Sequence, residues 1–105
     1  MDDLYEPDED PPVPEGGSLR WLPIINRRGL HARASAKFVQ TVERFDATVA
    51  VTRAGETVGG RSIMGLLTLG AAMGTRIAVT AVGPDAECCL EAITALLANR
   101  FGEEE

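Results

Sequence analysis

Apolar and polar positions repeat along the chain with two different periods, which predict helices and strands in turn. Residues 31–45 and 86–97 repeat apolar side chains at helical spacing, and residues 46–53 alternate between two sides as a half-buried strand does. The Ala54-Gly55 turn then leads into residues 56–61 and completes a predicted hairpin. The two predicted helix faces consist of Ala34, Phe38, Val39, Val42 and Phe45, and of Ala86, Cys89, Leu90, Ile93, Leu96 and Leu97.

Three shorter segments complete the predicted order of elements. Residues 19–25 form an apolar run in which Pro23 favours an edge strand or a bulge, and residues 75–82 form a further strand. Ser62 is typical of a helix N-cap, because its hydroxyl can accept a backbone N–H, and a short helix is predicted over residues 63–72. The order strand, helix, strand, strand, helix, strand, helix favours a two-layer α+β sandwich with the helices on one side of the sheet.

Charge divides the chain into a basic domain between two acidic segments. Residues 1–17 carry seven acidic side chains and four prolines, which predicts a disordered tail, and residues 103–105 are a second acidic tail. The predicted domain, residues 18–102, carries ten basic and six acidic side chains, a net charge of +4 in a chain of net charge −6. A basic surface attracts phosphate groups or acidic partners, or it only keeps the protein soluble. A further hypothesis is that the acidic tails fold back over the basic surface and slow docking.

Several classes of function do not fit this composition. A chain with no signal peptide and no long apolar run is expected to be cytoplasmic and not bound to a membrane. Scattered basic residues and few aromatic residues argue against nucleic-acid binding. Cys88 and Cys89 are neighbours in a predicted helix, so a disulfide between them is implausible, and with a single histidine they cannot form an ordinary zinc site. We therefore expect no metal and no cofactor.

His31, the only histidine, is predicted at the first turn of a helix, directly after Gly29-Leu30. Unpaired N–H groups and the positive dipole end of a helix stabilise a phosphate on or beside an imidazole there. Arg33 can add a guanidinium group suited to phosphate oxygens, and Gly29 permits a backbone conformation that leaves the ring uncovered. His31 is thus a candidate phosphorylation site, and the alternative is a histidine that only forms local hydrogen bonds.

Two separated motifs carry a resemblance to a known family. Gly29-Leu30-His31-Ala32-Arg33 and Arg61-Ser62-Ile63-Met64-Gly65-Leu66 resemble HPr, the histidine-containing phosphocarrier of the bacterial phosphoenolpyruvate-dependent phosphotransferase system, and the resemblance spans residues 19–101. It implies an open-faced sandwich in which a four-stranded antiparallel sheet carries three helices on one face. Ala34 is a departure, because the family usually has proline after the arginine, and the acidic N-terminal extension is another.

The resemblance implies a role for each matching residue. His31 would accept a phosphoryl group at Nδ1 beside Arg33, with Enzyme I as donor and an enzyme IIA-type protein as acceptor, so that the chain is a co-substrate and not an enzyme. Ser62 matches a regulatory serine that a dedicated kinase phosphorylates in some bacteria, and helix capping alone is the alternative. An apolar docking patch is implied at Ile63, Met64 and Leu67, with core packing as the alternative, and Lys37 and Gln40 are predicted to contact partners as well.

The biological output stays open at this point. Residues 45–47 and 95–101 are similar to the nitrogen-related branch of the family, which serves regulation, so both sugar transport and nitrogen or metabolic regulation are retained. The competing class is a non-catalytic regulatory or anion-binding domain that acts by protein–protein contact. We expect a monomer in either case.

Overall fold

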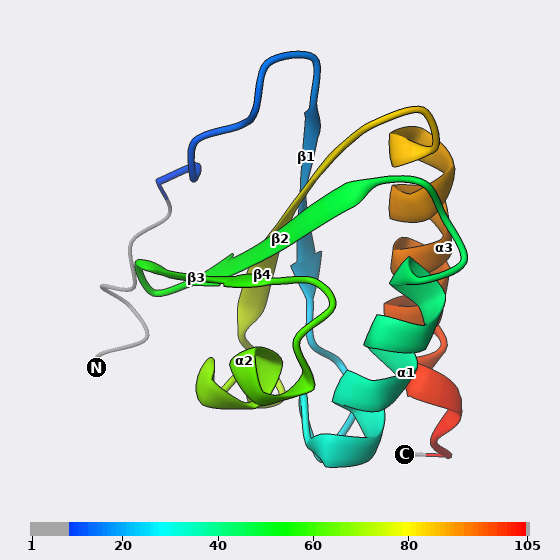
Figure 1. Ribbon diagram of the computed structural model, residues 1–105. Helices are drawn as coiled ribbons and strands as arrows, with labels where there is room; N and C mark the ends of the chain where they lie inside the picture. The colour runs from blue at the N-terminus through cyan, green and yellow to red at the C-terminus, as the bar shows by residue number, and fades with distance from the viewer. Residues whose placement is uncertain (1–8, 105) are drawn as a thin grey trace.

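The computed structural model describes residues 9–104 and confirms the predicted order of elements (Figure 1). Residues 1–8 of the predicted N-terminal tail and Glu105 of the C-terminal tail lie outside the described residues. The elements are β1 (Ser18–Pro23), α1 (Ala32–Val42), β2 (Thr48–Arg53), β3 (Glu56–Gly59), α2 (Ile63–Thr68), β4 (Arg76–Val82), α3 (Ala86–Ala98) and a final 3-10 turn, η2 (Arg100–Gly102).

The strands form one antiparallel sheet in the order β1-β4-β2-β3, and the helices cover one of its faces (Figure 1). β1 pairs only with β4, and Trp21 lies opposite Ala78 in this pairing. Pro23 therefore ends an edge strand, as predicted. The predicted α+β open-faced sandwich, with four antiparallel strands and three helices on one face, is confirmed.

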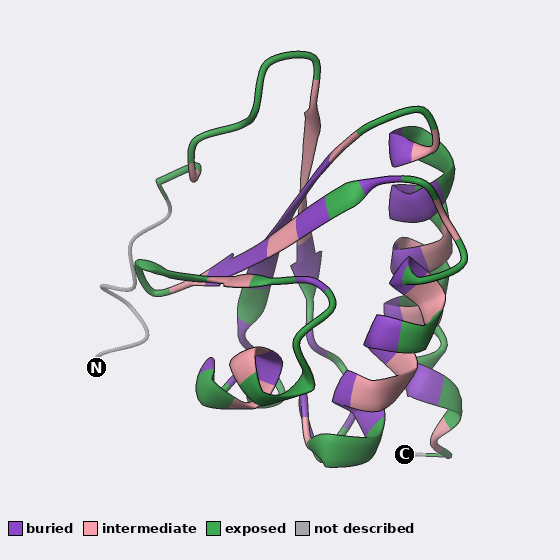
Figure 2. Cartoon of the chain, in the orientation of Figure 1, coloured by how far each residue is buried: buried purple, intermediate pink, exposed green. Residues whose placement is uncertain are grey.

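The core lies between the sheet and the inner faces of the helices (Figure 2). Alternation in the strands turns Val51 and Val79 toward Phe38 of α1 and Leu90 of α3, all fully buried. Burying one such side chain contributes about 1.5–3 kcal/mol relative to exposure. The predicted faces of both long helices are buried, except that Phe45 and Leu96 are only partly so.

Two helices are shorter than their apolar patterns predict. α2 ends at Thr68 and not at residue 72, because Gly70 adopts φ +61°, the left-handed conformation that terminates helices. α1 starts at Ala32, with His31 as its N-cap, and ends at Val42, where the amides of Arg44 and Phe45 turn to carbonyls three residues back. His31 therefore stands at the boundary of α1 and not inside its first turn.

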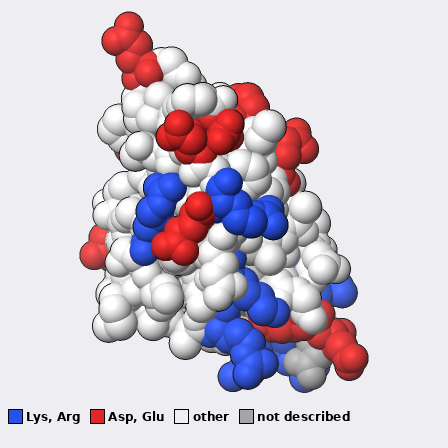
Figure 3. Space-filling view, turned by 45° about the vertical axis from the view of Figure 1, so that its right-hand side comes forward, with Lys and Arg blue, Asp and Glu red and all other residues white. Residues whose placement is uncertain are grey.

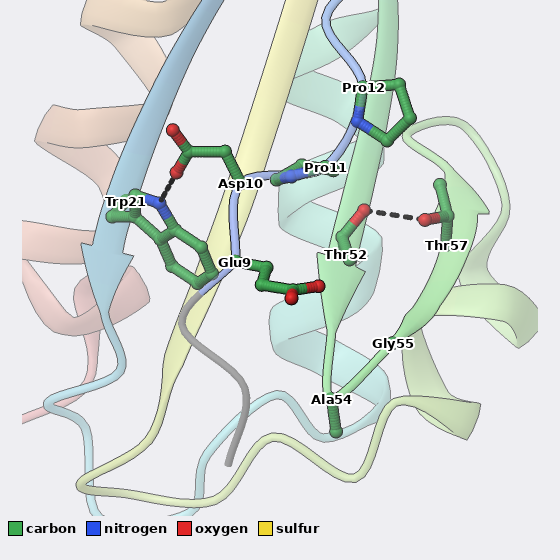
Figure 4. A pocket seen from close by; sticks show the side chains of 9 residues that line it. All are labelled: Glu9, Asp10, Pro11, Pro12, Trp21, Thr52, Ala54, Gly55 and Thr57. Atoms are coloured by element: carbon green, nitrogen blue, oxygen red, sulfur yellow. Dashed lines mark hydrogen bonds between the residues drawn. The ribbon is translucent and has the colours of Figure 1, made fainter.

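Residues 9–12 lie against the sheet face that the helices leave open (Figure 4). The indole Nε1 of Trp21 donates a hydrogen bond of 2.7 Å to Asp10. A cavity of about 220 Å³ lies between this segment and the strands, lined by Glu9, Asp10, Pro11, Pro12, Trp21, Thr52, Ala54, Gly55 and Thr57. Residues 9–12 of the acidic N-terminal segment are thus placed over the open face of the sheet.

Candidate phosphoryl-transfer site

A tight loop between β1 and α1 sets the position of His31. The amide of Gly29 donates to the carbonyl of Asn26 at 3.1 Å, and the amide of Leu30 donates to the carbonyl of Ala71 at 2.9 Å. Gly29 has φ +69°, and a Cβ there would lie 2.6 Å from the Ala71 oxygen, so a larger residue cannot take this place without moving the backbone. The loop is therefore tied to the segment that follows α2.

His31 itself is the N-cap residue of α1. Its backbone is extended, its carbonyl accepts the amide of Ser35 at 2.8 Å, and its side chain makes no capping hydrogen bond. The ring accordingly lies beside the N-terminal end of an eleven-residue helix, where unpaired amides and the helix dipole favour negative charge. The side chain is 18% exposed, so the ring is more enclosed than the sequence predicts.

Glu103, from the far end of the chain, accounts for this enclosure. Its Oε2 lies 2.5 Å from Nε2 of His31, and its Oε1 accepts a hydrogen bond of 3.1 Å from Nδ2 of Asn26. Burial acts to raise the pKa of Glu103, but the hydrogen bonds from His31 and Asn26, with the charges of His31 and Arg28, lower that pKa below the ordinary glutamate value. The carboxylate is therefore ionised at neutral pH.

Basic side chains surround this end of the molecule, where Figure 3 shows lysine and arginine beside acidic groups. Arg28 borders a shallow hollow of about 190 Å³ next to His31, whose floor includes Leu30 and Ala71. Arg33 is exposed in the first turn of α1, and within the described residues no hydrogen bond joins it to His31. The hollow is open to solvent, so an incoming group can approach the histidine from this side.

Ser62 occupies the predicted N-cap position of α2. Its hydroxyl oxygen accepts the amide of Gly65 at 2.9 Å, which confirms the capping contact, and the side chain is exposed. The next residues along α2 present apolar side chains to solvent, with Ile63 39% and Met64 71% exposed. Leu67 is half-buried, so the predicted apolar patch has two exposed members and one shared with the interior.

The two polar residues predicted to contact partners differ in their surroundings. Lys37 donates from Nζ to the carbonyl oxygen of Phe101 at 2.6 Å and is partly buried. Gln40, one turn further along α1, is exposed. Lys37 therefore also fixes the C-terminal turn, a role that the sequence analysis does not assign to it.

Glu103 and Asn26 are the two site residues that sequence reasoning missed. Glu103 belongs to a segment predicted as an acidic tail, and Asn26 to a predicted turn with no chemical role. The contact between His31 and Glu103 joins residues 72 positions apart, a separation on which local periodicity carries no information. An asparagine in the turn five residues before the histidine is the one signal that the sequence offers.

Within residues 9–104, no group of three or more histidine, cysteine, aspartate or glutamate side chains is placed to hold a metal ion. In the same range, no helix has the length and apolar character needed to cross a bilayer.

Comparison with known proteins gives one consistent result. The family described as PTS HPr component phosphorylation site matches residues 20–99. The phosphocarrier protein HPr of Cupriavidus necator is 46% identical over 82 residues, covering 78% of this chain and 92% of that protein. The phosphocarrier protein HPr of Neisseria meningitidis serogroup B is 48% identical over 84 residues, covering 80% and 94%.

The solved structures agree. The crystal structure of HPr-C-His from Thermoanaerobacter tengcongensis superposes with a TM-score of 0.80 at 36% identity, covering 84% of this chain and 99% of that one. Fold and similarity together define a small phosphocarrier protein, which carries a phosphoryl group and is not a catalyst in itself. The chain belongs to the HPr family of the phosphotransferase system.

Proposed function

We propose that His31 accepts a phosphoryl group at Nδ1 from phosphorylated Enzyme I and passes it to an enzyme IIA-type protein. The observation that carries this proposal is the placement of the ring at the N-terminus of α1, with Nε2 occupied by Glu103. Of the two ring nitrogens, Nδ1 is then the one available to a phosphoryl donor. The exchange takes place in the cytoplasm with the carrier as a monomer, and it serves sugar uptake or nitrogen and metabolic regulation.

The proposed transfer step needs a nucleophilic ring nitrogen and groups that stabilise the phosphoryl oxygens. The Nδ1 lone pair attacks phosphorus, the bond from phosphorus to the donor atom breaks, and the donor keeps that electron pair. The positive end of α1 stabilises the phosphoryl oxygens, and the exposed guanidinium of Arg33 can reach them from the same turn. The reverse sequence at Nδ1 delivers the group to the acceptor and restores the neutral ring.

Docking is assigned to the exposed surface of α1 and α2, which pack against each other. Ile63 and Met64 offer apolar contact, with Leu67 at its border and Gln40 on the neighbouring helix. An exposed methionine adapts to surfaces of different shape, which suits a carrier that meets a donor and an acceptor in turn. Lys37 contributes positive charge to this surface while it holds Phe101.

Ser62 is proposed as a second phosphorylation site, controlled by a serine kinase and phosphorylase. Its hydroxyl is exposed and adjoins Ile63 and Met64 in the chain. A phosphoserine there adds between one and two negative charges beside an apolar docking surface, which opposes docking by desolvation cost. The regulatory role thus acts on partner binding and leaves the ring of His31 chemically intact.

Incubation of the full chain with active Enzyme I and labelled phosphoenolpyruvate tests the proposal. The expected product is a phosphate that is labile in acid and stable in alkali, is absent from His31→Ala, and passes to an added enzyme IIA-type protein. Glu104→Gln, which changes an exposed acidic residue nearby, serves as the matched control and retains full labelling. Reversible binding of inorganic phosphate without covalent transfer would instead identify a regulatory anion-binding domain.

A further inference from the structure

We infer that Glu103 is a positioning residue that fixes the tautomer of His31. Its carboxylate can only accept a hydrogen bond, so the ring nitrogen 2.5 Å away, Nε2, must carry the proton of the neutral imidazole. The lone pair of the neutral ring then lies on Nδ1. This inference rests on the proposed function, in which Nδ1 is the nucleophile.

Asn26 holds the carboxylate in this orientation. Its Nδ2 carries two hydrogens, and the structure uses both: one reaches the carbonyl of Gly29 at 2.8 Å and the other reaches Oε1 of Glu103 at 3.1 Å. The opposite orientation of the amide would set its oxygen against two other acceptor oxygens. Asn26 is fully buried, so the loop before His31 and the carboxylate are joined by one rigid side chain.

The backbone conformation after the C-terminal end of α3 places Glu103 beside His31. Arg100 and Phe101 have φ of 54° and 55°, left-handed conformations that are energetically costly for non-glycine residues. Burial of Phe101, which is 1% exposed, and the bond from Lys37 to its carbonyl offset that cost. The reversal of the chain in η2 brings residue 103 back to the start of α1. The buried Phe101 and its bond from Lys37 anchor this reversal and so hold Glu103 beside the ring.

A fixed carboxylate at Nε2 also assists the transfer step itself. When Nδ1 forms its bond to phosphorus, the ring keeps the proton on Nε2 and becomes positively charged. Glu103 neutralises this charge through a charge-assisted hydrogen bond, which is roughly twice as strong as a neutral one. When the bond between Nδ1 and phosphorus breaks, the electron pair returns to the ring, so no proton has to leave or enter in either direction.

The tautomer can be read directly from the ¹⁵N chemical shifts of His31 in the unphosphorylated full chain, at a pH where the ring is neutral. The wild type is expected to show a protonated Nε2 and an unprotonated Nδ1. Glu103→Gln keeps the shape and an acceptor oxygen but loses the charge, and it is expected to populate both tautomers. Initial phosphorylation by Enzyme I should be about tenfold slower in this variant, in proportion to the lost charge assistance.

Glu104→Gln is the matched control and is expected to leave both the shifts and the rate unchanged. A wild-type ring protonated at Nδ1, or a tautomer ratio that is the same in wild type and Glu103→Gln, would overturn the inference. The two proposals fail separately: a chain whose Nε2–H tautomer is lost in part in Glu103→Gln but which accepts no phosphoryl group refutes the carrier function and retains the role of Glu103 in orienting the ring.

Discussion

The Glu103 carboxylate stays ionised although it is partly buried. The Glu103 side chain is 18% exposed, as is that of His31, yet it is ionised because hydrogen bonds and positive charge outweigh the cost of desolvation. Asn26 lies behind it with both amide hydrogens used, while its Oδ1 has no hydrogen-bond partner among the described residues. The arrangement depends on an amide at position 26, since a carboxylate there would repel Glu103.

The lowered pKa of Glu103 predicts a specific dependence of stability on pH. The unfolded chain binds a proton at Glu103 near the ordinary glutamate value of about 4.3, whereas the folded chain binds it only at lower pH. The stabilisation is therefore complete above that value and is lost as the pH falls through the folded pKa. Chemical denaturation of Glu103→Gln between pH 3 and 7, roughly the range in which a glutamate titrates, should show a shallower loss than wild type.

Glu104→Gln provides the comparison, because the residue is exposed and adjacent. It should retain the wild-type slope of unfolding free energy against pH. Parallel curves for wild type and Glu103→Gln would show that the carboxylate gains nothing from its contacts with His31 and Asn26.

The adjacent cysteines are expected to differ in reactivity. Burial raises the pKa of the Cys89 thiol, more than the charges of Arg61 and Arg44 lower it, whereas Cys88 is exposed. Because the thiolate is the reactive form, a thiol reagent should label one site in the native chain and two after denaturation. Mass spectrometry after Cys88→Ser should then find no native labelling, and rapid native labelling of Cys89 would contradict the buried placement.

At the scale of elements, α2 depends most on its ends. It has six residues and one buried side chain, Leu66, so neither length nor packing makes it stable alone. The hydroxyl of Ser62 caps its first turn and Gly70 terminates its last. The apolar pattern continues to residue 72 and predicts a longer helix, because periodicity records which residues are apolar and not where the backbone turns left-handed.

Removal of the α2 cap should therefore be measurable. Ser62→Ala leaves the amide of Gly65 without its acceptor and is expected to lower the free energy of unfolding by about 0.5–2 kcal/mol. Ser62→Asp supplies another acceptor and should recover most of the loss. Urea denaturation measures both variants, and a Ser62→Ala chain as stable as wild type would show that the capping contact contributes nothing.

At the scale of the whole molecule, the two layers of the fold can be predicted from the sequence, whereas the site can be predicted only in part. Alternation at Val49 and Val51 and the helical repeat through Phe38 and Val42 predict which sides meet, since each apolar face must be buried. The motif around His31 predicts the histidine and the helix start beside it. No local pattern predicts that Glu103 returns to the ring, because that contact depends on the reversal at Phe101 and on the tertiary bond from Lys37.

Both described acidic segments have places on the folded domain. Asp10 binds Trp21 on the open face of the sheet, and Glu103 binds His31 at the end of α1. The hypothesis that the tails lie over the basic surface and slow docking stays a prediction. The Glu103 contact adds a different role for the C-terminal acidic segment. In the inferred arrangement, its carboxylate covers Nε2 of the ring and leaves the lone pair on Nδ1 for reaction.

The central claim is that His31 carries the phosphoryl group on Nδ1, and identifying the phosphorylated ring nitrogen tests it most directly. NMR of the ¹⁵N-labelled full chain, after reaction with phosphoenolpyruvate and Enzyme I, detects the ³¹P–¹⁵N coupling of a phosphohistidine directly. The account predicts phosphorus bonded to Nδ1 of His31, with Nε2 still protonated against Glu103. Phosphorus on Nε2, or a chain that acquires no phosphohistidine from an active Enzyme I, would contradict it.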